Sequence, residues 1–272
     1  MELGVLGPLV VRRDGRDEAL GGPRQRALLA ILLLRANETV SRDRLIDGLW
    51  GAQPPPTADH TLDTYVSRLR KLLGDDRLER RPPGYALRVE PGELDLDRFE
   101  DLLRSGREAL ARGEPAAAAD ALSAALALWR GPALADLQYE PFAQQAVEQL
   151  EERRLQAAEE RVEADLALGR SAELVPELEA LARDHPFRER LLGQLMLARY
   201  RAGRQGRPKR SPRSRRAGGG WRRSSAWSQG RASGGSKRRS WRRIPRSWRI
   251  LSGGRRGAGR EHGRSGASSE RS

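Results

Sequence analysis

The 272-residue chain contains no cysteine and only three histidines, and these two shortages narrow the chemistry that it can perform. Without cysteine there is neither a disulfide framework nor a thiolate metal site. The histidines are too scattered to form a metal-ligand cluster or a Ser/His/Asp set, and the sequence has no Gly-x-x-x-x-Gly-Lys-Ser/Thr phosphate loop. We therefore expect a protein that is not an enzyme and that uses no cofactor and no metal.

Long apolar segments are also missing. The longest apolar run, residues 27–34, is far too short to span a bilayer. The N-terminus has no basic segment followed by an apolar stretch, which a secretory leader would need. The sequence thus predicts a soluble, cytoplasmic protein with no membrane partner.

Most of the chain has little net charge of either sign, although the formal net charge of the whole chain is +14. Residues 206–272 hold 21 Lys and Arg against two acids, a net of +19, whereas residues 1–205 hold 30 against 35, a net of −5. The high overall charge therefore describes the C-terminal segment alone. Any nucleic-acid site in the first 205 residues has to be judged from where its charges lie.

The first 90 residues change from short strands to helices and back to strands. Residues 2–13 alternate as two short apolar strands, and Asp14-Gly15 provides the turn that ends them. Helices are predicted over residues 24–35 and 42–50, the second with Ser41 as its N-cap.

A third helix is predicted over residues 58–73, with Thr57 as N-cap and Gly74 as C-cap. Apolar residues recur along it at spacings of four, three and four, which places them on one stripe: Leu62, Val66, Leu69 and Leu73. The opposite face collects polar and basic side chains, namely His60, Thr61, Thr64, Ser67, Arg68 and Lys71. A hairpin follows over residues 78–89, with a Pro-Pro-Gly turn at 82–84 and two arginines beside its tip.

From Asp95 the pattern is helical throughout. Helices are predicted to end at Gly113, Gly169 and Gly203, and the last two glycines are 34 residues apart, the period of a tetratricopeptide-type helix pair. Further helices are predicted over the following ranges: 116–129, 141–168 and 172–184. This segment is a helical-repeat domain.

The pattern breaks shortly after Gly203. Residues 206–272 are dominated by Arg, Gly, Ser, Ala and Pro and hold four of the six Trp, with too little apolar surface to offset chain entropy, so disorder is predicted. One hypothesis is that GC-rich DNA is read here in a shifted frame, which would leave Leu192, Leu195 and Met196 of the last helix exposed. The alternative is a genuine basic tail that adds salt-sensitive, sequence-independent DNA affinity.

The order strand–strand–helix–helix–helix–hairpin is the winged helix-turn-helix plan, and particular segments extend the likeness. They are LGGPRQRALLA at 20–30, LIDGLWG at 45–51, TLDTYVSRLRKLLG at 61–74 and RRPPGYAL at 80–87. Together they resemble the OmpR-like, phosphorelay-type DNA-binding domain of the Streptomyces antibiotic regulatory protein (SARP) family. The stretch LDLDRF at 94–99 and the repeats behind it resemble that family's bacterial transcriptional activation domain.

The predicted fold class is mainly α, in three parts. Residues 1–92 form a winged helix-turn-helix (α+β) DNA-binding domain, residues 93–205 a tetratricopeptide-like activation domain that is truncated, and residues 206–272 a disordered tail. The resemblance implies a cytoplasmic activator of pathway-specific genes, often for secondary metabolism. Its implied partners are direct repeats in double-stranded DNA near promoters and RNA polymerase holoenzyme including the sigma factor; a homodimer on DNA is a further expectation.

In such a fold the third helix enters the major groove and the hairpin wing reaches the minor groove. Arg68 is the candidate for reading a guanine, since a guanidinium can bond O6 and N7 together, and Thr64 for a thymine methyl or a base edge. The other expected DNA contacts are Ser67 and Lys71 on the same face, His60, Thr61, Tyr65 and Arg70 on its flanks, Trp50 before it, and Arg80 and Arg81 at the wing.

Two other functional classes stay open on the sequence alone. One is a non-enzymatic helical-repeat scaffold whose N-terminal domain binds protein. The other is an RNA-binding protein that acts through its basic, Trp-containing tail, because aromatic side chains stack on single-stranded bases.

Overall fold

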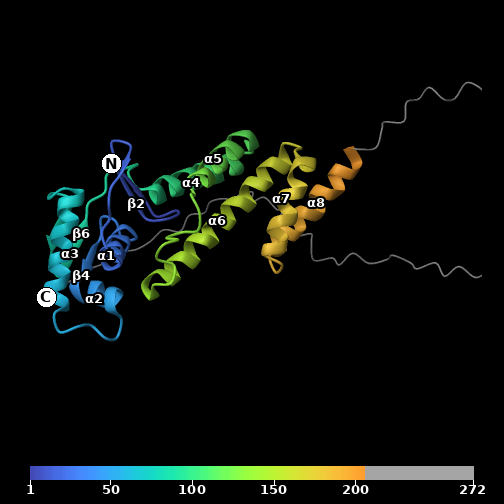
Figure 1. Cartoon of the computed structure of the whole chain (residues 1–272). Helices are drawn as coiled ribbons and strands as arrows, with labels where there is room; N and C mark the ends of the chain where they lie inside the picture. The colour runs from blue at the N-terminus through green and yellow to red at the C-terminus, as the bar shows by residue number, and fades with distance from the viewer. Residues whose placement is uncertain (206–272) are drawn as a thin grey trace, which may run out of the picture. The chain divides into compact units, whose positions relative to one another are not determined.

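The computed structural model describes residues 1–205 (Figure 1). The predictions for residues 206–272, namely disorder, a shifted reading frame and RNA binding through the tail, lie outside the described residues. Within residues 1–205 no helix is both long enough and apolar enough to cross a membrane.

The N-terminal domain opens with a small antiparallel sheet. Strands β1 (Glu2–Gly4), β2 (Val10–Arg13) and β3 (Arg16–Asp17) lie in that order, with Leu3 opposite Val11. The two predicted strands are confirmed, and β3 continues the sheet beyond the predicted turn. Asp14 and Gly15 both have positive φ, the conformation that a tight connection between β2 and β3 requires.

Three helices follow and pack together beneath a second sheet. They are α1 (Pro23–Leu33), α2 (Arg42–Trp50) and α3 (Ala58–Leu73). Strands β4 (Thr39–Ser41), β5 (Leu78–Arg81) and β6 (Gly84–Leu87) form an antiparallel sheet in the order β4-β6-β5, and the β5–β6 hairpin is the wing. A side chain at Gly84 would bring its Cβ within 1.9 Å of the Val40 carbonyl oxygen, so only glycine allows this close approach of β6 to β4.

The predicted caps have different outcomes. The Ser41 hydroxyl accepts a hydrogen bond from the Arg44 amide at 3.3 Å, which confirms it as the cap of α2. Thr57 occupies the predicted N-cap position of α3, but its side chain accepts no capping hydrogen bond, because its backbone (φ −94°, ψ 12°) is not in the extended conformation of an N-cap. Instead its carbonyl oxygen accepts hydrogen bonds from the amide and the hydroxyl of Thr61.

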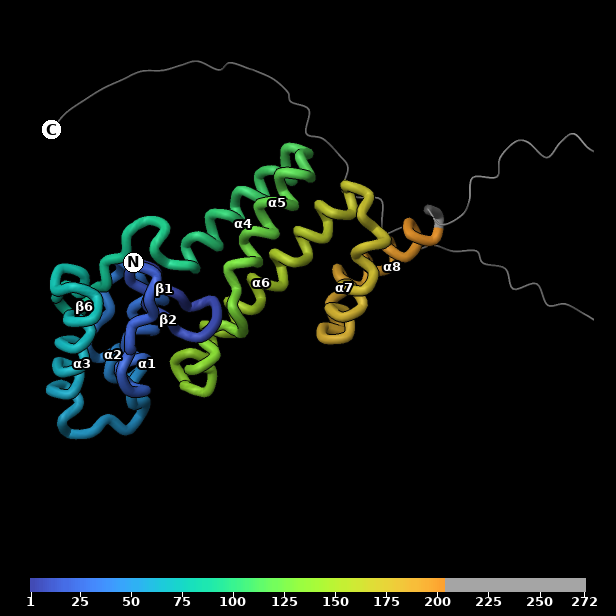
Figure 2. Tube along the Cα trace, turned by 45° about the horizontal axis from the view of Figure 1, so that its top comes forward, coloured from blue at the N-terminus to red at the C-terminus, as the bar shows by residue number. Residues whose placement is uncertain are grey.

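The helical domain contains α4 (Asp95–Ala111), α5 (Pro115–Ala127), α6 (Pro141–Ala167), α7 (Ser171–Asp184) and α8 (Glu189–Gln205). Figure 2 shows α4 beside α5, as the helix pair around Gly113 predicts. It also shows α7 beside α8, so α7 packs mainly on the helix that follows it rather than on α6, which precedes Gly169. Gly113 and Gly169 end helices in the left-handed region, as predicted. Gly203 does not, since α8 runs on to Gln205; glycine weakens a helix by only about 1 kcal/mol and does not force it to end.

Trp129 lies just beyond α5 rather than inside it, so the predicted helix over 116–129 is slightly too long. Its indole ring meets the Phe99 ring edge-on at 5.5 Å between centroids. Near the end of the described chain, α6, α7 and α8 share a small separate core. Leu195 is buried in that core, contrary to the expected exposure, whereas Leu192 and Met196 are exposed.

The main hydrophobic core crosses the predicted boundary between residues 92 and 93. Asp95, the first residue of α4, accepts hydrogen bonds from the backbone amides of Val5 and Leu6 at 2.8 and 3.1 Å, and its carboxylate also pairs with Arg130 at 2.9 Å. The segment after α5 pairs with the same N-terminal loop, since the Arg130 amide donates to the Leu6 carbonyl at 2.8 Å. The N-terminal and helical domains are therefore joined by packing and by hydrogen bonds as well as by the chain.

Candidate nucleic-acid interface

Helix α3 has one buried face and one exposed face. The apolar stripe predicted from the sequence is buried: Leu62, Val66, Leu69 and Leu73 are each at most 2% exposed. On the opposite side His60, Ser67, Arg68 and Lys71 are exposed, and Thr61 and Thr64 are half-buried. Figure 2 shows α3 along the outside of the N-terminal domain, where a long ligand could lie against it.

Three cations of α3 and the wing are both exposed and unpaired. Within residues 1–205, Arg68, Lys71 and Arg80 make no hydrogen bond or ion pair with their side chains. An anionic partner can therefore bind them without breaking a hydrogen bond or an ion pair, although the charge of Arg80 also contributes to lowering the pKa of Asp63. All three belong to the set predicted from the sequence.

Two other predicted arginines are already engaged. Arg81 pairs with Glu79 on the same strand at 2.8 Å. The Nε of Arg70 donates to the Leu78 carbonyl at 3.0 Å, and its guanidinium lies 6.0 Å from the centre of the Tyr85 ring. Arg70 thus fastens α3 to the wing, and only the remaining N–H groups of its guanidinium are left for a phosphate.

The threonine hydroxyls on α3 also have internal partners. Thr61 donates to the Thr57 carbonyl at 2.9 Å, and Thr64 donates to the His60 carbonyl at 3.1 Å. Each hydroxyl hydrogen is therefore used within the helix. What these side chains offer outward is an oxygen acceptor and a methyl group, which suits contact with an amino group or a thymine methyl.

Trp50 and Tyr65 contact each other across α2 and α3. Their rings are stacked at 6.5 Å between centroids with 16° between planes, and both are half-buried. This packing sets the distance between the two helices. The predicted contacts of the Trp50 indole N–H and the Tyr65 hydroxyl with a DNA backbone stay predictions.

Arg42, the first residue of α2, was missed by the sequence reasoning and holds the site together. Its guanidinium donates to Asp63 at 2.6 Å, to Asp59 at 2.9 Å and to the Tyr85 hydroxyl at 2.9 Å. The Tyr85 hydroxyl in turn donates to Asp63 at 2.8 Å. One side chain thus links the start of α2, the first half of α3 and strand β6.

The charges and hydrogen bonds of this network shift the pKa values of its members. The hydrogen bond from Arg42 is the main cause that lowers the pKa of Asp63, and Asp63 in turn raises the pKa of Arg42. Burial, followed by the bond to Asp63, raises the pKa of Tyr85. Arg42 therefore compensates the two carboxylates near the start of α3, which would otherwise repel a phosphate backbone.

Fold and surface together define a class of protein. A helix with a buried leucine stripe, a free basic face and an adjoining arginine-bearing hairpin is a winged helix-turn-helix module, and here it is joined to a domain of helical repeats. The comparisons with known proteins give the same two parts. Residues 16–87 match the family model "Transcriptional regulatory protein, C terminal", and residues 94–208 match "Bacterial transcriptional activator domain".

Individual relatives agree with these matches. The chain is 40% identical over 215 residues to regulatory protein DnrI of Streptomyces peucetius, covering 75% of this chain and 79% of that protein. It is 48% identical over 206 residues to regulatory protein AfsR of Streptomyces coelicolor, covering 75% of this chain but 21% of that protein. It also resembles a solved structure of Mycobacterium tuberculosis EmbR in complex with a low-affinity phosphopeptide, with a TM-score of 0.73 and 41% identity over 75% of this chain and 55% of that one.

The chain belongs to the SARP family of transcriptional regulators. It spans only about a fifth of the AfsR proteins and 54% of the EmbR protein that it matches.

Proposed function

We propose that this chain is a sequence-specific DNA-binding activator of pathway-specific genes, with secondary-metabolite genes as the expected targets. The observation that carries the proposal is the exposed, unpaired set of Arg68, Lys71 and Arg80 on α3 and the wing, set above a fully buried leucine stripe. In this arrangement α3 enters the major groove, where Arg68 reads a guanine, and the β5–β6 wing places Arg80 and Arg81 at the neighbouring minor groove.

The remaining contacts of the proposed interface have simpler roles. Lys71 and His60 bind phosphates, and Thr64 and Ser67 present oxygen acceptors to base edges. Thr61, Tyr65, Trp50 and the free N–H groups of Arg70 lie at the margin and hold the backbone in register. The operator we propose is a pair of direct repeats near a promoter, each repeat bound by one winged helix, with two copies of the chain on one DNA.

The helical domain is proposed to contact RNA polymerase holoenzyme, including its sigma factor. The family model that matches residues 94–208 supports this, since its description is that of an activator domain. We propose no enzymatic activity. The protein is proposed to act in the cytoplasm, where promoter DNA is found. A run-off transcription assay with purified holoenzyme tests it: binding to the promoter without any rise in transcript would refute the activator role.

The DNA-binding proposal is tested with the full chain on its selected duplex. The site is first identified by repeated selection from a random DNA pool. Arg68→Ala is then expected to weaken binding by about 1–3 kcal/mol and to relax the preference at one guanine position. Lys71→Ala is expected to weaken binding to all DNA sequences alike and to lower the slope of log affinity against log salt concentration by about 1.

Arg24→Ala is the matched control, because Arg24 is also exposed and unpaired within residues 1–205 but belongs to α1 and not to α3 or the wing. If no duplex is selected, or if Arg68→Ala behaves like Arg24→Ala, the DNA-reading function is refuted and the protein-binding scaffold becomes the better description.

A further inference from the structure

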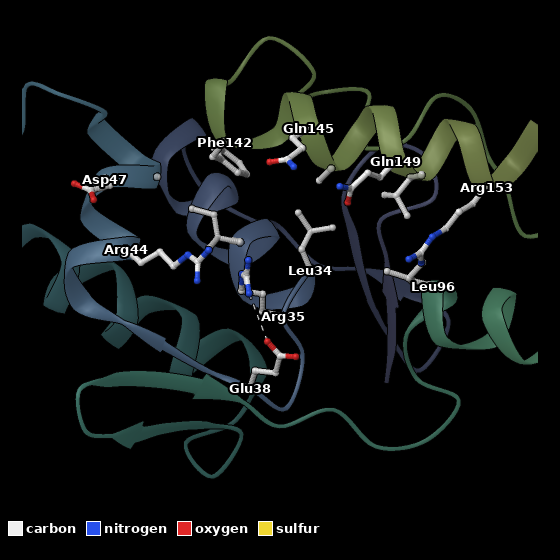
Figure 3. A pocket seen from close by; sticks show the side chains of 14 residues that line it. Leu34, Arg35, Glu38, Arg44, Asp47, Leu96, Phe142, Gln145, Gln149 and Arg153 are labelled. Carbon is white, nitrogen blue, oxygen red and sulfur yellow. Dashed lines mark ion pairs between the residues drawn. The ribbon is translucent and has the colours of Figure 1, made fainter.

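An open cleft of about 630 Å³ lies between the N-terminal domain and the helical domain, and we call it the α2–α6 cleft. Figure 3 shows its walls: α1 and α2 on one side and α6 on the other, with the start of α4 at one end. Small-molecule sites usually have volumes of about 300–1,000 Å³ and often lie between domains. None of the proposed DNA contacts lines this cleft.

The floor of the cleft is apolar and comes from both domains. Ile31 and Leu34 of the α1 segment face Phe142 and Leu150 of α6. Gly48 of α2 lies against the same floor, since a Cβ at that position would be 2.7 Å from the end of the Ile31 side chain and 3.8 Å from the Cβ of Phe142. A ligand in the cleft would thus find a hydrophobic surface whose two halves belong to different domains.

The rim of the cleft is polar, and part of it has no partner. The side chains of Arg44, Gln145 and Gln149 are exposed and make no hydrogen bond or ion pair within residues 1–205. Figure 3 shows Arg44 extending from α2 toward the middle of the cleft, while Asp47 points the other way.

The other cations of the rim are already paired. Arg35 is 3.6 Å from Glu38, and Arg153 pairs with Glu100 of α4. Arg44 is therefore the unpaired positive charge of the cleft, and the two glutamine amides on the facing helix add neutral donors and acceptors.

We propose that the α2–α6 cleft binds a small amphiphilic anion, with an aromatic or alicyclic body and a single acid group. The acid group pairs with Arg44, and the amides of Gln145 and Gln149 bond its remaining oxygens or a hydroxyl on the body. The body lies on Ile31, Leu34 and Phe142. A small apolar floor inside a mainly polar rim with one free guanidinium favours this class over neutral compounds of the same shape, which lack the charge, and over free phosphate, which lacks the body.

Such a ligand would connect the two functional halves of the chain. It contacts α2, whose Trp50 stacks on Tyr65 of α3, and it contacts α6 of the helical domain. A compound that binds only when both walls are in place stabilises this arrangement by mass action. The cleft is thus placed to let a metabolite strengthen the junction between the DNA-binding and activator domains.

The test uses the full chain without DNA, so its outcome is independent of the DNA-binding proposal. The probes are anilinonaphthalene sulfonate and the neutral anilinonaphthalene, followed by fluorescence titration. Arg44→Gln is expected to lower the affinity for the sulfonate probe about fivefold, as the loss of one exposed charge pair would. The affinity for the neutral probe is expected to stay unchanged. Arg24→Gln, which removes an exposed, unpaired arginine outside the cleft, is expected to change neither.

A second variant tests the place of binding. Ala146→Trp fills the cleft from α6 and is expected to abolish binding of both probes. Should its thermal melt show that this variant does not fold, an aryl-azide form of the sulfonate probe is crosslinked to the wild-type chain, and peptides containing residues 44–48 or 145–150 are expected to carry the label. Equal affinities for Arg44→Gln and Arg24→Gln, unchanged binding to folded Ala146→Trp, or labelling elsewhere would each overturn the proposal.

Discussion

Replacing Asp95 with alanine removes a carboxylate that links the N-terminal loop to the helical domain. Asp95 is 8% exposed, and its carboxylate accepts hydrogen bonds from the amides of Val5 and Leu6 and pairs with Arg130. Val5 and Leu6 are fully buried, so water cannot replace the lost acceptor. The substitution therefore leaves two buried amides and one arginine without their shared partner.

The size of the effect follows from those contacts. A buried donor left unsatisfied costs about 1–3 kcal/mol, and a carboxylate in the first turn of a helix adds about 0.5 kcal/mol through the helix dipole. Because the three bonds share one carboxylate, their costs do not add fully, and we expect Asp95→Ala to lower the free energy of unfolding by about 3–5 kcal/mol. Asp95→Asn keeps one acceptor oxygen and is expected to lose about half as much.

Urea-induced unfolding followed by circular dichroism measures these losses. Asp101→Ala is the matched control, because Asp101 lies on the same helix but is exposed and pairs only with Arg104, so its loss should stay below about 0.5 kcal/mol. A difference of less than about 1 kcal/mol between Asp95→Ala and Asp101→Ala would refute the reasoning, since one unsatisfied buried amide alone should exceed it.

Three further predictions follow from the same kind of contact. Arg42→Ala leaves Asp59 and Asp63 uncompensated at the start of α3 and is expected to weaken operator binding at least about tenfold, with a stability loss of about 1 kcal/mol; equal affinity in a mobility shift would contradict the role given to it. The bond from Arg77 lowers the pKa of Glu93 from 4.5 to about 2, so its stabilisation is complete above about pH 4.5 and is lost as the pH falls toward 2. Glu93→Gln should therefore lower the free energy of unfolding by about 1–2 kcal/mol at pH 7 and reduce its fall between about pH 4.5 and pH 2. If the variant loses as much stability over this pH range as the wild type, the role given to Glu93 is wrong. Gly84→Ala forces β6 away from β4 and is expected to cost about 2 kcal/mol or more, whereas Gly22→Ala, at a position with open space and a negative φ, should cost less in the same urea titration.

Local patterns in the sequence were sufficient for the elements and for much of the candidate site. The helix over residues 58–73 has the bounds that its leucine spacing predicted, and Ser41 caps α2 as expected. Both signals involve residues within one helical turn of each other, so the sequence records them directly. The exposed face with Arg68 and Lys71 follows from the same periodicity.

Only the tertiary structure could decide which distant groups meet. Arg42 reaches Asp59 and Asp63, 17 and 21 residues away, and Tyr85 on a different strand, because of the angle at which α2, α3 and the wing pack. The same packing turned Arg70 toward a backbone carbonyl and paired Trp50 with Tyr65.

By itself, then, the sequence determined which segments form most of the helices and which face of α3 is apolar, because those properties depend on neighbours three or four residues apart. The tertiary structure decided that Asp95 holds the N-terminal loop, that the core is continuous between the domains and that a cleft opens between α2 and α6. These features depend on the relative placement of whole elements, which is set by the fit of their side chains and leaves no periodic trace in the chain.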